Sequence, residues 1–114
     1  MFSTVDNRVQ LIGFLGQDIE LREYAEGKKM ARMSMATHEY QKGEEGKSET
    51  ITTWHNLVAW GKIAEVMNKI LRKGQRLYVE GKLSYREYTG NDNVKKNATE
   101  IIISDFKKLE SADK

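Results

Sequence analysis

Apolar residues recur at every second position over much of this chain, which is the spacing of a β-strand with one buried face. The first such segment begins at Arg8 and is predicted to end at Gly16; its alternating positions are Val9, Leu11, Gly13 and Leu15. The residues from Ile19 to Tyr24 alternate more weakly. After a glycine-containing turn the pattern returns at Ala31, Met33, Met35 and Thr37. The pattern therefore predicts three extended segments before residue 40.

Three further extended segments follow. The all-polar stretch from Gln41 to Ser48 predicts a loop that joins two long strands, the second of which ends at Trp60. Alternation resumes at Leu77, Val79 and Leu83 and stops at the turn sequence Gly90-Asn91-Asp92-Asn93. A last β-rich run covers Ala98 to Phe106.

Between Gly61 and Gly74 the apolar spacing changes to that of an amphipathic helix, with Ile63, Val66, Met67, Ile70 and Leu71 on one face. We expect Gly74 to take the left-handed position that ends this helix. A single helix between the third and fourth main strands of an all-β chain is the plan of the OB-fold. We therefore predict an all-β, five-stranded OB-fold Greek-key barrel.

The chain has 114 residues, which leaves room for one domain of ordinary size. We expect residues 1–107 to form the domain and residues 108–114 a short polar C-terminal tail. The absence of cysteine excludes disulfides and thiolate zinc sites, and fits a cytoplasmic location. The longest apolar run has four residues, from Leu57 to Trp60, so we expect no membrane partner.

Basic and aromatic residues gather in one part of the chain. The net charge is only +2, but the segment from Trp54 to Lys96 holds nine basic and four acidic residues. Side chains alternate along a strand, so Trp54 and Trp60 lie on the face opposite the apolar residues of their strand. Arg86 and Tyr88 likewise lie opposite the apolar residues of their own strand. Flat rings among cations suit single-stranded nucleic acid, whose bases stack while its phosphates meet positive charge. The alternative at this point is that both tryptophans lie in the core.

Other motifs give little support for catalysis or for a cofactor. Gly46-Lys47-Ser48 is similar to the end of a phosphate-binding P-loop, but Gln41 stands where the motif needs its first glycine, and no helix is predicted to follow. His38 and His55 have no third partner at a metal-ligand spacing. We therefore expect no enzyme activity, no cofactor and no metal site.

The chain resembles the bacterial single-stranded DNA-binding protein family from about Asn7 to Phe106. The similarity rests on six stretches in the family's order: Gly13-Phe14-Leu15-Gly16-Gln17-Asp18, Ala36-Thr37, Thr53-Trp54-His55-Asn56, Trp60-Gly61-Lys62-Ile63-Ala64-Glu65, Leu71-Arg72-Lys73-Gly74 and Glu80-Gly81-Lys82-Leu83. The resemblance implies a homotetramer that binds single-stranded DNA in the cytoplasm, with the nucleoid. It implies DNA-stacking aromatics at Trp54, Trp60 and Tyr88, phosphate-contacting cations at Lys62, Lys73 and Arg86, and a subunit contact at His55.

Three features depart from the family pattern. Tyr40 lies one residue short of the family's fourth stacking aromatic when counted from Ala36-Thr37, and we retain it as a DNA-binding candidate. Ser84 and Glu87 stand where family members often have basic residues. The sequence ends at Lys114 without the acidic tip that recruits replication and repair proteins in the family. We therefore expect this chain not to bind those proteins.

The leading hypothesis is a non-catalytic protein that binds and protects single-stranded DNA, without strong sequence preference, during replication, recombination and repair. One alternative is an OB-fold dimer of the replication-restart or RNA-binding type. Two others are a small metal-dependent OB-fold nuclease and an oligomer with a purely structural role.

Overall fold

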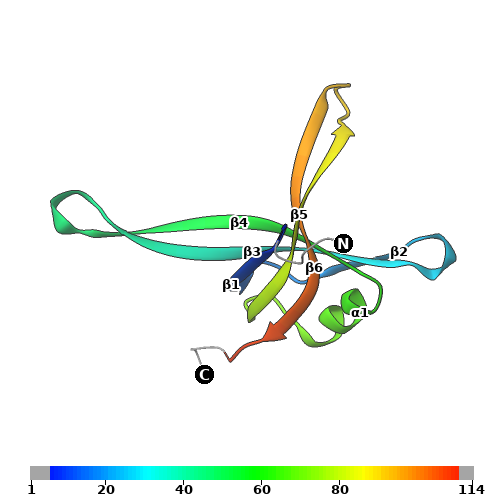
Figure 1. Ribbon diagram of the computed structural model, residues 1–114, viewed down its shortest axis with the longest axis horizontal. Coiled ribbons are helices and arrows are strands. Elements are labelled where there is room, and N and C mark those ends of the chain that lie inside the picture. Colours follow the sequence, from blue (N-terminus) through cyan, green and yellow to red (C-terminus); the bar gives the residue numbers. More distant parts are fainter. Residues whose placement is uncertain (1–5, 111–114) are drawn as a thin grey trace.

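The computed structural model describes residues 6–110, which form six strands and one α-helix (Figure 1). The elements are β1 (Val9–Leu15), β2 (Glu20–Glu23), β3 (Lys29–Lys42), β4 (Ser48–Trp60), α1 (Gly61–Ile70), β5 (Arg76–Thr89) and β6 (Lys95–Lys108). Two single-turn 3₁₀ segments, Ala25–Gly27 and Glu44–Gly46, form the turns before β3 and β4. The residues expected as a tail lie partly outside the described residues.

Five of the strands close into a barrel. The sheet order is β1-β5-β6-β4-β3-β2, and β1 also pairs with β3, which joins the two sides of the sheet. All neighbours are antiparallel except β4 and β6, which run parallel through Leu57↔Ile101 and Val58↔Ile102. The short β2 lies outside this circle, at the edge of β3. The predicted five-stranded barrel, with its helix between the third and fourth main strands, is confirmed.

Alternate residues of the strands fill the barrel, as the period of two predicts. The core includes Met33, Met35, Leu57, Leu77, Val79, Ile101 and Ile103 from the strands and Ala64 and Met67 from α1. Leu83 differs from the prediction, because it is 41% exposed. It shares the inward parity of Leu77 and Val79, but it lies beyond Gly81, the last residue of β5 that pairs with β1, where β5 pairs with β6 alone.

The helix ends earlier than its apolar pattern predicts. Its last residue is Ile70, and Leu71 is already extended at φ −106° and ψ 146°. Gly74 does have a left-handed φ of 88°, but it belongs to the next turn, in which the Gln75 N–H donates to the Arg72 carbonyl at 3.0 Å. The helix end is covered by the Arg72 guanidinium, which donates to the carbonyl oxygens of Asn68, Lys69 and Leu71. Gly74 is thus not the cap that we expected.

Two hairpins extend beyond the barrel, β3–β4 and β5–β6, and point in different directions (Figure 1). They give the molecule extents of 56 × 39 × 37 Å. With ten residues, α1 is too short to cross a bilayer, and residues 6–110 contain no longer helix.

Candidate nucleic-acid interface

The strand register places the predicted aromatic and basic positions on one surface. Arg32 of β3 is opposite Val58 of β4, Val58 is opposite Ile102 of β6, and Ile102 is opposite Lys82 of β5. Side chains alternate along a strand, so the even-numbered residues of these strands, up to the register shift after Ile103 of β6, point outward together. We call this surface the outer face and define it by Arg32, Ser34, Trp54, Asn56, Val58, Trp60, Lys82, Ser84, Arg86, Tyr88, Ala98 and Glu100.

The aromatic residues of the outer face are exposed in the isolated chain. Trp54 is 61% exposed and Trp60 is 46% exposed, while Tyr88 is also open to solvent. Neither tryptophan belongs to the core cluster. The alternative that the tryptophans fill the barrel is therefore wrong, and their rings are available to stack on a ligand.

Gly16 fixes the place of the Trp54 ring. A Cβ atom added at Gly16 would lie 2.4 Å from Cζ3 of Trp54 and 3.1 Å from Oγ of Ser34. Side chains do not approach this closely, so the indole packs against bare backbone. The glycine after β1 thus keeps the ring of Trp54 in its position on the barrel surface.

Trp60 has an aromatic neighbour that the sequence analysis missed. The ring of Tyr24 lies 6.2 Å from that of Trp60, at an interplanar angle of 36°. Tyr24 directly follows β2. In the sequence it only ends a weakly alternating stretch, which gives no indication that it contacts Trp60. A hollow of about 460 Å³ next to Trp60 is lined in part by Lys28 and Lys29. Rings and cations therefore lie together at this end of the outer face.

Arg86 and Tyr88 lie together on β5, but Arg86 is already paired. Its guanidinium carbon is 5.4 Å from the centroid of the Tyr88 ring, which is a cation–π distance. The same guanidinium donates to Oε2 of Glu100 at 3.1 Å, and Arg32 donates to that oxygen at 2.9 Å. Neither Arg32 nor Glu100 was a predicted site residue.

The two arginines keep Glu100 ionised. Burial by itself would raise the pKa of this carboxyl, but hydrogen bonds from Arg86 and Arg32, together with their charges, lower the pKa below its ordinary value. The three residues line a hollow of about 310 Å³ on the outer face, together with Ser34, Asn56 and Tyr88. Polar groups and the Tyr88 side chain thus surround a space open to solvent.

The two candidate lysines lie apart from each other. Lys62 is exposed in the first turn of α1, where it lines a hollow of about 530 Å³ with Lys29, Lys69 and Arg72. Lys73 is exposed in the turn after the helix, and its backbone N–H donates to the Asp18 carboxylate at 2.8 Å. Lys62 therefore lies among cations, although Glu65 lines the same hollow and pairs with Lys29 at 3.5 Å.

His55 has the opposite parity from Trp54 and is half-buried. Its Nε2 lies 2.9 Å from the hydroxyl oxygen of Thr37 on β3. Burial lowers the pKa of His55 from its ordinary value of 6.5, so the ring is mostly neutral at pH 7. A neutral, half-buried ring away from the outer face suits a contact with another surface better than a contact with phosphate.

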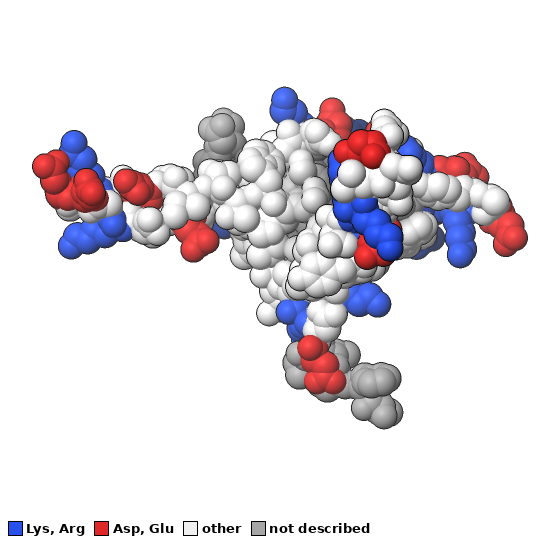
Figure 2. Space-filling model, turned by 90° about the horizontal axis from the view of Figure 1, so that it is seen from above, with Lys and Arg blue, Asp and Glu red and all other residues white. Residues whose placement is uncertain are grey.

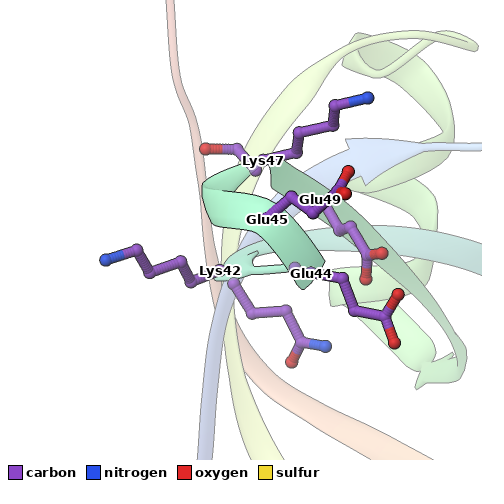
Figure 3. Close-up of a pocket in the computed structure, with 8 residues that line it drawn as sticks. Lys42, Glu44, Glu45, Lys47 and Glu49 are labelled. Carbon is purple, nitrogen blue, oxygen red and sulfur yellow. The ribbon is translucent and has the colours of Figure 1, made fainter.

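Tyr40 has the same outward parity as Trp54 but lies far along the β3–β4 hairpin, where it is 80% exposed. A hollow at the tip of this hairpin is lined by Lys42, Glu44, Glu45, Lys47 and Glu49, and the two lysines extend in opposite directions (Figure 3). Acidic and basic side chains mix at this end of the molecule (Figure 2). β4 begins at Ser48, so a strand follows Gly46-Lys47-Ser48, and the P-loop interpretation is excluded.

Residues 6–110 contain no group of three or more His, Asp or Glu side chains that could hold a metal ion.

Comparison with known proteins gives consistent matches. The model of the single-strand binding protein family matches residues 6–109. The chain is 42% identical over 108 residues to single-stranded DNA-binding protein 1 of Chlorobaculum tepidum, covering 94% of this chain and 67% of that protein. It is 40% identical over 103 residues to the single-stranded DNA-binding protein of Xanthomonas campestris, covering 90% of this chain and 60% of that protein. The chain thus spans about three-fifths to two-thirds of the length of these relatives.

Two solved structures have a similar fold. The Plasmodium falciparum protein in the structure described as an SSB complex with ssDNA superposes with a TM-score of 0.86 at 33% identity, covering 96% of this chain and all of that one. A deletion mutant of the single-stranded DNA binding protein from Thermus aquaticus superposes with a TM-score of 0.81 at 26% identity, covering 93% of this chain and 51% of that one.

Proposed function

The chain belongs to the single-strand binding protein family, and from this premise we propose that it binds single-stranded DNA across the outer face of its barrel. The observation that carries the proposal is the exposure of Trp54 and Trp60 on the same face as Arg86 and Tyr88. Exposed rings cost a protein favourable burial unless a ligand covers them. Bases of a single strand are free to cover them, whereas the bases of a duplex are already stacked on one another.

We propose two kinds of contact. Trp54, Trp60 and Tyr88 stack on bases, with Tyr40 as a further stacking position when the strand reaches the β3–β4 hairpin. The side chains of Lys62, Lys73 and Arg86 meet phosphates. Every base has a π-face, and phosphates carry no sequence information, so binding of this kind has little sequence preference.

The proposed role is protective and non-catalytic. Covered bases cannot pair or react, which keeps a single strand available during replication, recombination and repair. Such a role places the protein in the cytoplasm, at the nucleoid.

We also propose a homotetramer, with His55 at a contact between subunits. The half-buried, neutral ring of His55 on the side of β4 away from Trp54 supports this place for the contact. Sedimentation of the purified chain at micromolar concentration tests the assembly, and a dimer would favour the replication-restart or RNA-binding type.

The proposed binding is tested by titrating poly(dT) into the protein and following tryptophan fluorescence at several salt concentrations. We expect the fluorescence to be quenched, with an affinity that falls linearly with salt on a double logarithmic plot. A fluorescence signal and a sedimentation profile that poly(dT) leaves unchanged would favour a purely structural oligomer. Poly(U) in the same titration distinguishes a preference for DNA from a preference for RNA.

A further inference from the structure

The outer face contains a carboxylate that a surface for binding DNA would be expected to lack. Glu100 is 7% exposed and is the one buried charged residue among residues 6–110. A buried carboxylate close to phosphates is unfavourable unless other groups of the site compensate its charge. Its partners indicate what it does.

Glu100 joins two strands that are distant in sequence. Arg32 comes from β3 and Arg86 from β5, and both donate to the same oxygen, Oε2 of Glu100, at 2.9 and 3.1 Å. Both guanidinium groups are partly exposed, whereas the carboxylate is covered. Two guanidinium groups are therefore exposed to solvent, but the three residues together carry one net positive charge instead of two.

The group also lies where a bound strand would pass. It lines the hollow of the outer face with Asn56 and Tyr88, and the guanidinium of Arg86 remains within cation–π distance of the Tyr88 ring. A phosphate beside a base stacked on Tyr88 would therefore meet Arg86 while Arg86 is still bound to Glu100.

Building on the function proposed above, we propose that Glu100 is a positioning residue that limits the electrostatic strength of single-stranded DNA binding. It holds Arg32 and Arg86 in place on the outer face and cancels one of their two charges. Together the two arginines then neutralise one phosphate rather than two. The release of counterions, and with it the salt dependence of binding, is smaller than the number of cations implies.

The test compares Glu100→Gln with Glu87→Gln in titrations of poly(dT) from about 0.05 to about 0.2 M salt, conditions in which phosphate contacts dominate the change in affinity. Both variants gain one unit of net charge. Glu87 has the odd parity of β5, facing away from the outer face, and it forms no ion pair within the described part of the chain. We expect a plot of log K against log[salt] that is steeper by about 0.7 for Glu100→Gln than for Glu87→Gln, which is about 2.6-fold more affinity lost over this range.

Equal slopes in the two variants would overturn the inference. If Glu100→Gln does not fold, as judged by circular dichroism, the double variant Arg32→Gln/Glu100→Gln replaces it, because it keeps the net charge of the group and leaves Arg86 as its single cation. We expect the salt slope of the parent in this double variant. A slope lower by about 0.7 would mean that both arginines already act independently, and it would overturn the inference. A parent protein that does not bind poly(dT) would contradict the proposed function itself.

Discussion

The indole of Trp54 lies against the backbone of Gly16, so closely that a Cβ atom at Gly16 would fall 2.4 Å from Cζ3 of the ring. The two residues belong to different parts of the barrel: Gly16 directly follows β1, and Trp54 lies in the middle of β4. A glycine that looks like turn punctuation in the sequence therefore determines where a DNA-stacking side chain can lie.

Substituting Gly16→Ala should move the Trp54 ring and weaken binding of poly(dT). The loss should not exceed the roughly 1–3 kcal/mol that one stacked base contributes. Gly90→Ala is the matched control, because the atoms nearest its Cβ would be the ends of the Asp92 and Lys96 side chains, at 3.0 Å and beyond. Fluorescence titration measures both variants, and an equal affinity for the two would remove Gly16 from the account of the site.

Replacing His55 by lysine should loosen the tetramer. Burial lowers the pKa of His55, so the native ring is mostly uncharged at pH 7, whereas lysine would bring a charge into a covered contact. His38→Lys is the control, since His38 is exposed on the opposite side of its strand pair. Sedimentation at micromolar protein should show smaller species for His55→Lys alone. A His55→Lys protein as tetrameric as the parent would place the subunit contact elsewhere.

The pKa of Glu100 predicts how the fold responds to acid. Burial raises this pKa, but the hydrogen bonds and charges of Arg86 and Arg32 outweigh burial, and the net shift is below the ordinary value of 4.5. A carboxyl with a lowered pKa in the folded state stabilises the fold above its unfolded pKa, and this stability is lost as pH falls through the folded pKa.

We therefore expect the melting temperature of the parent to fall more steeply below pH 4.5 than that of Glu100→Gln. Some acid sensitivity should remain in the variant, because the Tyr78 hydroxyl and Arg8 lower the pKa of Glu80 as well. Thermal melts followed by circular dichroism at a series of pH values provide the measurement. Parallel curves for the two proteins would mean that the arginines do not favour the ionised carboxyl.

The period-two pattern predicted both the barrel and the face on which its aromatics lie. Parity was sufficient to predict the outward direction of four side chains, because a strand alternates its side chains whatever its neighbours are. These are Trp54, Trp60, Arg86 and Tyr88. Parity predicted burial at Leu83 and was wrong there, because exposure depends on where the barrel ends and the hairpin begins.

Contacts between distant residues could not be predicted in this way. Arg32 and Glu100 are 68 positions apart and meet only because β3, β4 and β6 are neighbours in the sheet. The pairing of Tyr24 with Trp60 likewise depends on how β2 packs at the edge of β3. At the helix end, the apolar period continued through Leu71, while the backbone had already become extended.

Lys73→Ala should change the salt dependence of binding rather than its stacking component. Loss of one phosphate contact should flatten log K against log[salt] by about 0.7 and cost less affinity at high salt than at low salt. Lys107→Ala removes the same charge from an exposed position of β6 opposite Tyr78 and is the control. Two equally flattened plots would show that only net charge matters, not contact of Lys73 with the DNA.

The most direct test of the account is the binding of poly(dT) by Trp60→Ala, measured at several salt concentrations alongside circular dichroism of the variant. Trp60 is 46% exposed and outside the core, so the fold should remain. Affinity should fall by roughly 5- to 150-fold, equivalent to about 1–3 kcal/mol, with the salt slope nearly unchanged. A variant that unfolds, with residual binding in proportion to its folded fraction, would show that Trp60 supports the barrel rather than the DNA.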